Sequence, residues 1–246
     1  MRRRAHCAAC LLIAACSPIV ARPGVTWHEG SAGSPNGAIE EAADEAAAAA
    51  GHGSIVAATD AGSRELRVWS GFGLQRWLSY VRVVEDGAGI RGEHVLVWNE
   101  PADEHCGDNT RQLADTLPCI ELRTAGRSVA CVLPANSIDW PALLRRLERL
   151  QIWNLRDGAE LGAVSGLDGV CLAVALRDGA RWRRYEWCNP HGHADAVHAW
   201  AILELIERLD PMRVVRMPWD PPSKVPPPAF CDALEPEPRT AEEDSA

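Results

Sequence analysis

Hydrophobic and polar residues alternate over short stretches in the middle of the chain, as is typical of β-strands. Residues 65–69 (ELRVW), 79–84 (SYVRVV) and 93–99 (EHVLVWN) alternate or cluster residues that favour strands. Residues 101–110 (PADEHCGDNT) are rich in polar and turn-forming residues, so a loop is expected there. The pattern therefore predicts three short strands followed by a loop.

Residues 119–131 (CIELRTAGRSVAC) have the pattern of a β-hairpin. In a three-residue loop at Thr124-Ala125-Gly126, the glycine would take the left-handed position that such loops need. This register would place Cys119 opposite Cys131, where a disulfide could join the two strands.

Residues 169–188 (GVCLAVALRDGARWRRYEWC) predict a second hairpin, which turns within residues 177–180. A two-residue and a four-residue loop both fit, and because the two registers differ by two residues, each side chain keeps its face. The four-residue loop places Cys171 directly opposite Cys188, so a cross-strand disulfide is geometrically feasible. The face predicted to be core carries Val170, Leu172, Val174, Leu176, Tyr185 and Trp187.

Two segments show the apolar spacing of helices. Asp139 and Pro141 are typical of a helix start, and a second helix is expected over residues 194–209. The predicted buried stripes are Leu143, Leu144, Leu147 and Leu150 in the first helix, and Ala199, Ile202, Leu203, Ile206 and Leu209 in the second. Hairpins in this order, without β-α-β spacing, predict an α+β fold: one domain whose antiparallel sheet carries two helices packed on one face.

The composition changes at both ends of this predicted domain, which we place at residues 54–210. Residues 22–53 begin with proline and glycine and continue as an Ala- and Glu-rich stretch without a wide apolar stripe, so a frayed helix or flexible spacer is expected. Residues 211–246 are rich in proline and acidic residues, which predicts an extended or disordered tail.

The charge and the aromatic content limit the classes of partner. The formal net charge is -9, whereas a phosphate-binding surface needs the opposite sign, so no nucleic-acid partner is predicted. Ten tryptophans stand against two tyrosines and two phenylalanines, and most are expected in the core. Should Trp69, Trp98 or Trp182 be exposed, they would offer a platform for carbohydrate binding.

The first sixteen residues have the features of an export signal. Three arginines at residues 2–4 precede an apolar stretch at residues 8–15 that is too short to span a bilayer. The tetrapeptide Ile13-Ala14-Ala15-Cys16 then closes the segment and resembles the lipobox of bacterial lipoproteins. This resemblance is limited to the N-terminus, and the remainder of the chain resembles no family of known function.

The lipobox resemblance implies cleavage before Cys16, which would divide the N-terminus into a signal peptide (1–15) and a lipid-anchored spacer (16–53). It also implies a diacylglycerol thioether on the Cys16 sulfur, and an outer-membrane location where the cell has one. Ordinary signal cleavage after Ala21 is the alternative and would release a soluble secreted or periplasmic protein. A basic, Ala-rich start without any export is a third interpretation.

The cysteine count agrees with export. Cleavage before Cys16 and its acylation would leave six cysteines, an even number that suggests disulfides in an oxidising compartment. The two hairpins predict the pairs Cys119–Cys131 and Cys171–Cys188, which leaves Cys106 and Cys231 as a candidate third pair. Free, half-buried cysteines of a cytosolic protein are the alternative.

Residues 189–198 (NPHGHADAVH) contain the candidate metal ligands His191, His193, Asp195 and His198. The H-x-H-x-D string superficially resembles the metal motif of metallo-β-lactamase-like hydrolases. That motif places another histidine directly after the aspartate, where this chain has Ala196, and it needs histidines further along the chain. We therefore interpret the segment as a helix start with Asp195 as its start signal, and no metal, cofactor or catalytic residue is predicted.

These observations predict a membrane-anchored envelope lipoprotein with a structural or binding role, which is non-enzymatic and acts through the sheet face that the helices leave free. Its predicted partners are the membrane, through the lipid, and an unidentified envelope protein or polysaccharide. A periplasmic zinc-dependent hydrolase and a carbohydrate-binding envelope protein are the alternatives.

Overall fold

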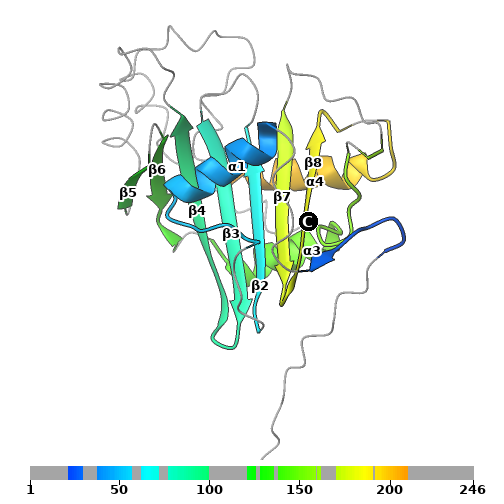
Figure 1. The fold of residues 1–246 in the computed structure, drawn as a ribbon, viewed down its shortest axis with the longest axis horizontal. Coiled ribbons are helices and arrows are strands. Elements are labelled where there is room, and N and C mark those ends of the chain that lie inside the picture. The colour runs from blue at the N-terminus through cyan, green and yellow to red at the C-terminus, as the bar shows by residue number, and fades with distance from the viewer. Residues whose placement is uncertain are drawn as a thin grey trace, which may run out of the picture.

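An antiparallel sheet of eight strands forms the centre of the protein in the computed structural model (Figure 1). The structure describes residues 22–29, 38–56, 62–71, 77–99, 121–125, 128–135, 138–158, 160–161, 170–190 and 192–209. The strands are β1 (His28–Glu29), β2 (Arg64–Ser70), β3 (Trp77–Asp86), β4 (Gly89–Asn99), β5 (Glu121–Ala125), β6 (Ser128–Leu133), β7 (Cys171–Asp178) and β8 (Arg181–Cys188). They lie in the order β1-β8-β7-β2-β3-β4-β6-β5, and every pair is antiparallel. The predicted α+β class with an antiparallel sheet is confirmed.

Helices α3 (Trp140–Arg149) and α4 (Ala196–Glu207) share one hydrophobic core with the sheet. Asp139 caps α3 as predicted, because its side chain accepts a hydrogen bond from the Ala142 backbone N–H at 2.9 Å, and Pro141 lies in the first turn. The sheet side chains of this core include Leu66, Val68, Val81, Val83, Leu172, Val174, Leu176, Tyr185 and Trp187. The core face predicted for the second hairpin is thus the face that packs against α3 and α4.

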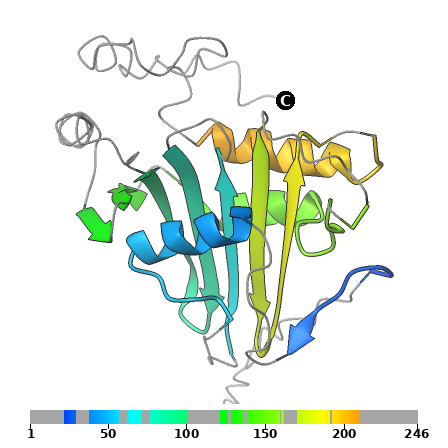
Figure 2. The ribbon, with the colours of Figure 1, turned by 45° about the horizontal axis from the view of Figure 1, so that its top comes forward.

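Helix α1 (Ala38–Ala49) lies across the opposite face of the sheet from α4 (Figure 2). Over residues 41–50, where side chains are described, its buried positions are all alanines, each at most 4% exposed: Ala43, Ala46, Ala47 and Ala49, followed by Ala50. Small side chains let the helix backbone approach the sheet closely, and the bulk of this second core comes from Trp69, Tyr80, Val95 and Val97. The prediction of a flexible spacer is therefore wrong for residues 38–50, which pack into the domain.

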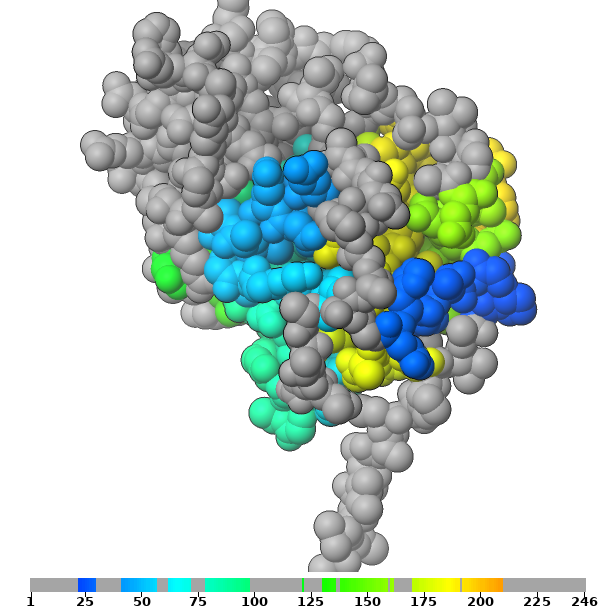
Figure 3. Space-filling model, in the orientation of Figure 1, coloured from blue at the N-terminus to red at the C-terminus, as the bar shows by residue number. Residues whose placement is uncertain are grey.

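The sheet face that was predicted to be free for binding carries α1 instead, so this part of the prediction is wrong. In the space-filling view, α1 covers the strands beneath it (Figure 3). The start of the described chain is also part of the domain, because β1 pairs with β8 through His28 opposite Trp182 and Glu29 opposite Arg181.

The hairpin of β7 and β8 confirms the predicted disulfide. Cys171 lies directly opposite Cys188 with 4.1 Å between the Cα atoms, and the two form a disulfide. The ladder continues as far as Asp178 opposite Arg181, so the loop has two residues, Gly179 and Ala180. Gly179 has a φ of 61°, a conformation that glycine adopts without strain. The four-residue loop predicted for this register is therefore wrong, although the pairing of the cysteines is correct.

The hairpin of β5 and β6 has a different register from the prediction. Ala125 lies opposite Ser128, which leaves a two-residue loop, and Cys131 lies opposite Leu122. Cys131 is disulfide-bonded, but Cys119 lies outside the described residues, so the predicted pairing of the two stays a prediction.

Cys16, Cys106 and Cys231 also lie outside the described residues, as do the predicted signal peptide and the tail at 211–246. Among the described helices, none is long and apolar enough to cross a membrane.

Candidate functional site

Asp195, one of the candidate metal ligands, is 2% exposed and lies between two arginines. Its Oδ1 accepts a hydrogen bond from Arg22 Nη1 at 3.0 Å, and its Oδ2 accepts one from Arg156 Nε at 3.0 Å. Burial alone would raise the pKa of the Asp195 carboxyl, but the hydrogen bonds from Arg156 and Arg22 hold it below its ordinary value. The carboxylate is therefore charged, and both of its oxygens are occupied by guanidinium groups.

His193 is engaged by the same group of residues. Its Nδ1 lies 3.0 Å from the Asp195 backbone nitrogen, and its Nε2 lies 2.9 Å from Arg156 Nη2. A neutral imidazole has one acceptor nitrogen and a guanidinium only donates, so only one of these contacts is a hydrogen bond at any time. The Arg156 guanidinium therefore occupies the space beside His193 Nε2 and Asp195 Oδ2, where a zinc ion held by these two atoms would have to bind.

The remaining candidate ligands do not complete a metal site in the described part of the chain. His198 is a half-buried residue of α4, and His191 lies outside the described residues. The residues described here contain no group of three or more His, Cys, Asp or Glu side chains that could hold a metal ion. The predicted helix start is correct, since α4 begins at Ala196, but Asp195 makes no capping hydrogen bond because its side chain is turned to the arginines.

The tryptophans proposed for carbohydrate binding are buried where they are described. Trp69 is 2% exposed and stacks on Tyr80 with ring centroids 5.1 Å apart. Trp182 is 7% exposed and lies against the His28 ring at 4.7 Å. The side chain of Trp98 lies outside the description. A sugar-binding platform of Trp69 and Trp182 is therefore excluded in this structure.

A buried charge cluster centred on Glu65 is the polar feature that sequence reasoning missed. Glu65 is 2% exposed, and its Oε1 accepts hydrogen bonds from Arg67 Nε at 2.8 Å and Arg82 Nε at 2.7 Å. Its Oε2 lies 3.3 Å from Arg177 Nη2, which also donates to Ser63 Oγ at 3.0 Å. Burial raises the pKa of the Glu65 carboxyl, but the charges and hydrogen bonds of Arg67 and Arg82 lower the pKa by a larger amount, so the net shift is downward.

The cluster continues from the sheet to the segment that follows α1. Arg67 Nη1 donates to the Gly53 carbonyl oxygen at 2.7 Å. Burial raises the pKa of the Tyr80 phenol, so Tyr80 keeps its proton, and its hydroxyl oxygen lies 3.1 Å from His52 Nδ1. On the other side of the ring, His52 Nε2 lies 3.2 Å from Glu93 Oε2. These contacts join residues 52–53 to three strands and give the cluster a role in holding α1 on the sheet.

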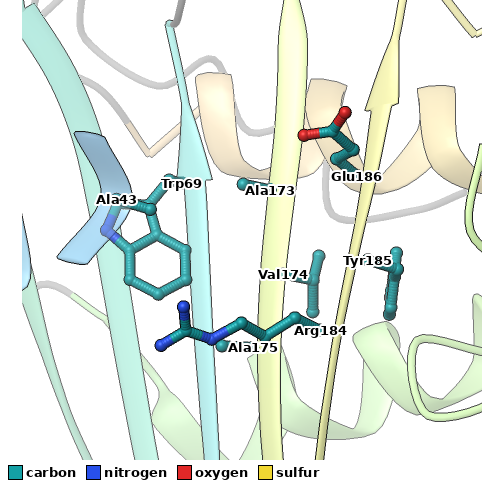
Figure 4. A pocket seen from close by; sticks show the side chains of 8 residues that line it. All are labelled: Ala43, Trp69, Ala173, Val174, Ala175, Arg184, Tyr185 and Glu186. Carbon is teal, nitrogen blue, oxygen red and sulfur yellow. The ribbon is translucent and has the colours of Figure 1, made fainter. Parts of the chain in front are cut away.

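A small cavity lies between α1 and strands β2, β7 and β8 (Figure 4). Its volume is about 10 Å³, which is close to the space that one water needs and far below an ordinary ligand pocket. Figure 4 shows the Arg184 side chain reaching across β7 toward Trp69, and its guanidinium pairs with Asp44 of α1. This cavity is therefore a packing defect beside an ion pair, with no room for a substrate.

No protein-family model matches the chain, and no curated protein or solved structure matches it either. The function must therefore be inferred from the residues themselves. In the described part of the molecule, the buried Glu65 and Asp195 carboxylates face arginines, whereas the buried Arg183 donates to two backbone carbonyl oxygens. Helix α1 packs on one face of the sheet, and α3 and α4 share a core with the other.

Proposed function

We propose that the protein is a lipid-anchored envelope protein with a structural or binding role. Cys16 would carry the diacylglycerol, and the acyl chains would hold the domain at the membrane surface, in the outer membrane where the cell has one. Its further partner would be an envelope protein or a polysaccharide.

The Cys171–Cys188 disulfide is the observation that carries this proposal. Disulfides persist in the periplasm and outside the cell, and they are rare in the reducing cytosol. Both cysteines are buried, at 4% and 6% exposed, and they face each other from neighbouring strands, so the bond is built into the sheet. An export signal is what such a domain requires, and the basic and apolar pattern before Cys16 provides one.

The domain itself supports a binding role more than a catalytic one. The cavity at Ala173 and Arg184 holds about 10 Å³, and the Glu65 carboxylate is neutralised by arginines on the inside of the fold. Enzyme sites instead combine a pocket of several hundred Å³ with accessible polar groups. The described residues therefore favour recognition at the outer surface.

The experiment that tests the anchor is an intact-mass measurement of the protein extracted from its own cell envelope. We expect a polypeptide that begins at Cys16 and carries two or three acyl chains. The variant Cys16→Ala should lose the acyl mass, whereas the matched variant Cys10→Ala, within the signal segment, should keep it. An unmodified chain that begins at Arg22 would overturn the lipid anchor and leave a soluble exported protein.

A further inference from the structure

The outer face of α4 carries an apolar pair at its N-terminal end. Val197 is 71% exposed and Trp200 is 42% exposed, and these two are the exposed large hydrophobic residues of the described chain. They are three residues apart on a helix, so their side chains are neighbours on one face. The opposite face of the helix is buried in the core through Ala199, Ile202, Leu203 and Ile206. This end of α4 is therefore apolar on its inner and its outer side.

The C-terminal end of the same outer face is charged. Glu204 and Arg208 lie one turn apart with 3.7 Å between Oε2 and Nη2, and their side chains are 59% and 60% exposed. The face thus changes along the helix from an apolar N-terminal end to a charged C-terminal end. A partner surface that contacted only the N-terminal end of this face would cover Val197 and Trp200 and leave the Glu204–Arg208 ion pair in water.

The chain that leads to the proposed anchor is fixed at this apolar end. Arg22 donates to Asp195, the residue that immediately precedes α4, at 3.0 Å. Cys16 lies six residues before Arg22, a distance that a fully extended chain spans with at most about 20 Å. An acylated Cys16 would therefore hold the N-terminal end of α4 within a short distance of the bilayer, which raises the local concentration of this end at the membrane surface.

We propose that the Val197 and Trp200 face of α4 docks on the surface of the bilayer into which the acyl chains of Cys16 insert. Tryptophan is enriched at membrane interfaces because its ring is apolar and its indole N–H is polar, and valine adds apolar area beside it. This inference rests on the proposed lipid anchor and adds an orientation to it. The domain is held with the N-terminal end of α4 toward the lipid and the Glu204–Arg208 end in water.

The test uses the acylated full-length protein, extracted from its envelope and reconstituted into vesicles of phosphatidylethanolamine and phosphatidylglycerol in equal parts. Brominated acyl chains in these lipids quench the fluorescence of any tryptophan that reaches the bilayer. We expect a loss of fluorescence relative to unbrominated vesicles, and we expect Trp200→Phe to remove most of that loss. Val197→Glu should also remove it, because the added charge opposes docking while Trp200 remains. The matched variant Glu204→Gln, on the charged end, should keep it.

The outcomes separate the docking from the anchor. Vesicle-bound protein without quenching, or with equal quenching in Trp200→Phe, would overturn the docking and leave the anchor intact. Protein that fails to float with the vesicles would overturn both. Shielding of Trp200 from solvent in native envelope membranes, without such shielding in lipid vesicles, would identify the face as a protein-binding surface. The membrane docking would then be wrong.

Discussion

Arg184 of β8 and Asp44 of α1 form a bidentate ion pair, with Nη1 3.0 Å from Oδ2 and Nη2 2.7 Å from Oδ1. The Arg184 side chain is 11% exposed and that of Asp44 is 30% exposed, so the pair lies at the edge of the interface between helix and sheet. An alanine face can pack on a sheet at several rotations of the helix, because alanines offer no distinctive shape. The two directional hydrogen bonds select one of these rotations.

Removal of this pair tests whether α1 depends on it. We expect Asp44→Ala to lower the free energy of unfolding by about 1–3 kcal/mol, because Arg184 is left largely buried without its carboxylate. The matched variant Glu45→Ala, at the exposed next position of the same helix, should change it by less than about 0.5 kcal/mol. Urea denaturation of the two variants measures the difference, and equal stabilities would show that packing alone positions α1.

The ring of Trp140, at the start of α3, leaves no space for a side chain at Gly92 of β4. A Cβ atom at this glycine would lie 2.3 Å from Cε3 of the indole, which is closer than two carbon atoms can approach without a shift of one of them. Trp140 is 7% exposed and packed in the core, so the ring has little freedom to move. We expect Gly92→Ala to destabilise the fold by about 1–3 kcal/mol, through overpacking. Gly87→Ala is the matched control, since nothing lies within 4 Å of its Cβ position, and similar thermal midpoints for the two variants would contradict the clash.

His94 predicts an acid sensitivity of the fold. The ring is 2% exposed, its Nε2 lies 2.9 Å from Ser79 Oγ, and burial lowers its pKa from 6.5 to about 4. Between these two values the unfolded chain binds a proton that the folded protein does not, so stability is lost as the pH falls from 6.5 toward 4. The stabilisation present above pH 6.5 and lost in this window is about 3 kcal/mol.

The slope of stability against pH measures this effect. We expect His94→Gln to flatten the dependence between pH 6.5 and pH 4, whatever its stability at neutral pH. Ser79→Ala removes the neighbouring hydroxyl but keeps the buried ring, so it should retain the slope of the wild type. A slope unchanged by His94→Gln would assign the acid sensitivity to other groups.

The sequence predicts strands β2 to β8 and helices α3 and α4, because large apolar residues mark most of them, whereas β1 falls in the segment expected to be a spacer. The stripe of Leu143, Leu144 and Leu147 and the alternation in β7 each have a clear period. Helix α1 lacks that signal, because alanine is too weakly hydrophobic to form an apolar stripe on its own, and its partners Trp69 and Tyr80 come from strands later in the chain. Its burial follows from the sheet and could not be read from residues 38–50 alone.

The buried charge cluster escaped prediction for a related reason. The period-two spacing of Glu65, Arg67 and Trp69 places them on one face of β2, but it does not say that the face is covered. The other members reach Glu65 only because β2 pairs with β3 and with β7, which places Arg82 and Arg177 beside it. The β2–β7 pairing joins residues more than a hundred positions apart, and no local pattern predicts it.

The Cys171–Cys188 bond should contribute measurably to stability. The bond closes a loop with a sequence separation of 17, and such a loop restricts the unfolded chain by about 3 kcal/mol. We expect the double variant Cys171→Ala, Cys188→Ala to lose about this amount in urea denaturation of the oxidised protein. Comparison of oxidised wild type with oxidised variant leaves the disulfide of Cys131 intact in both, so the difference in the free energy of unfolding belongs to the Cys171–Cys188 bond.

Alkylation of the unfolded, unreduced wild type should leave Cys171 and Cys188 unmodified. Their modification would remove the structural support for an oxidising compartment, whereas their protection together with the stability loss would make the bond a structural part of the fold.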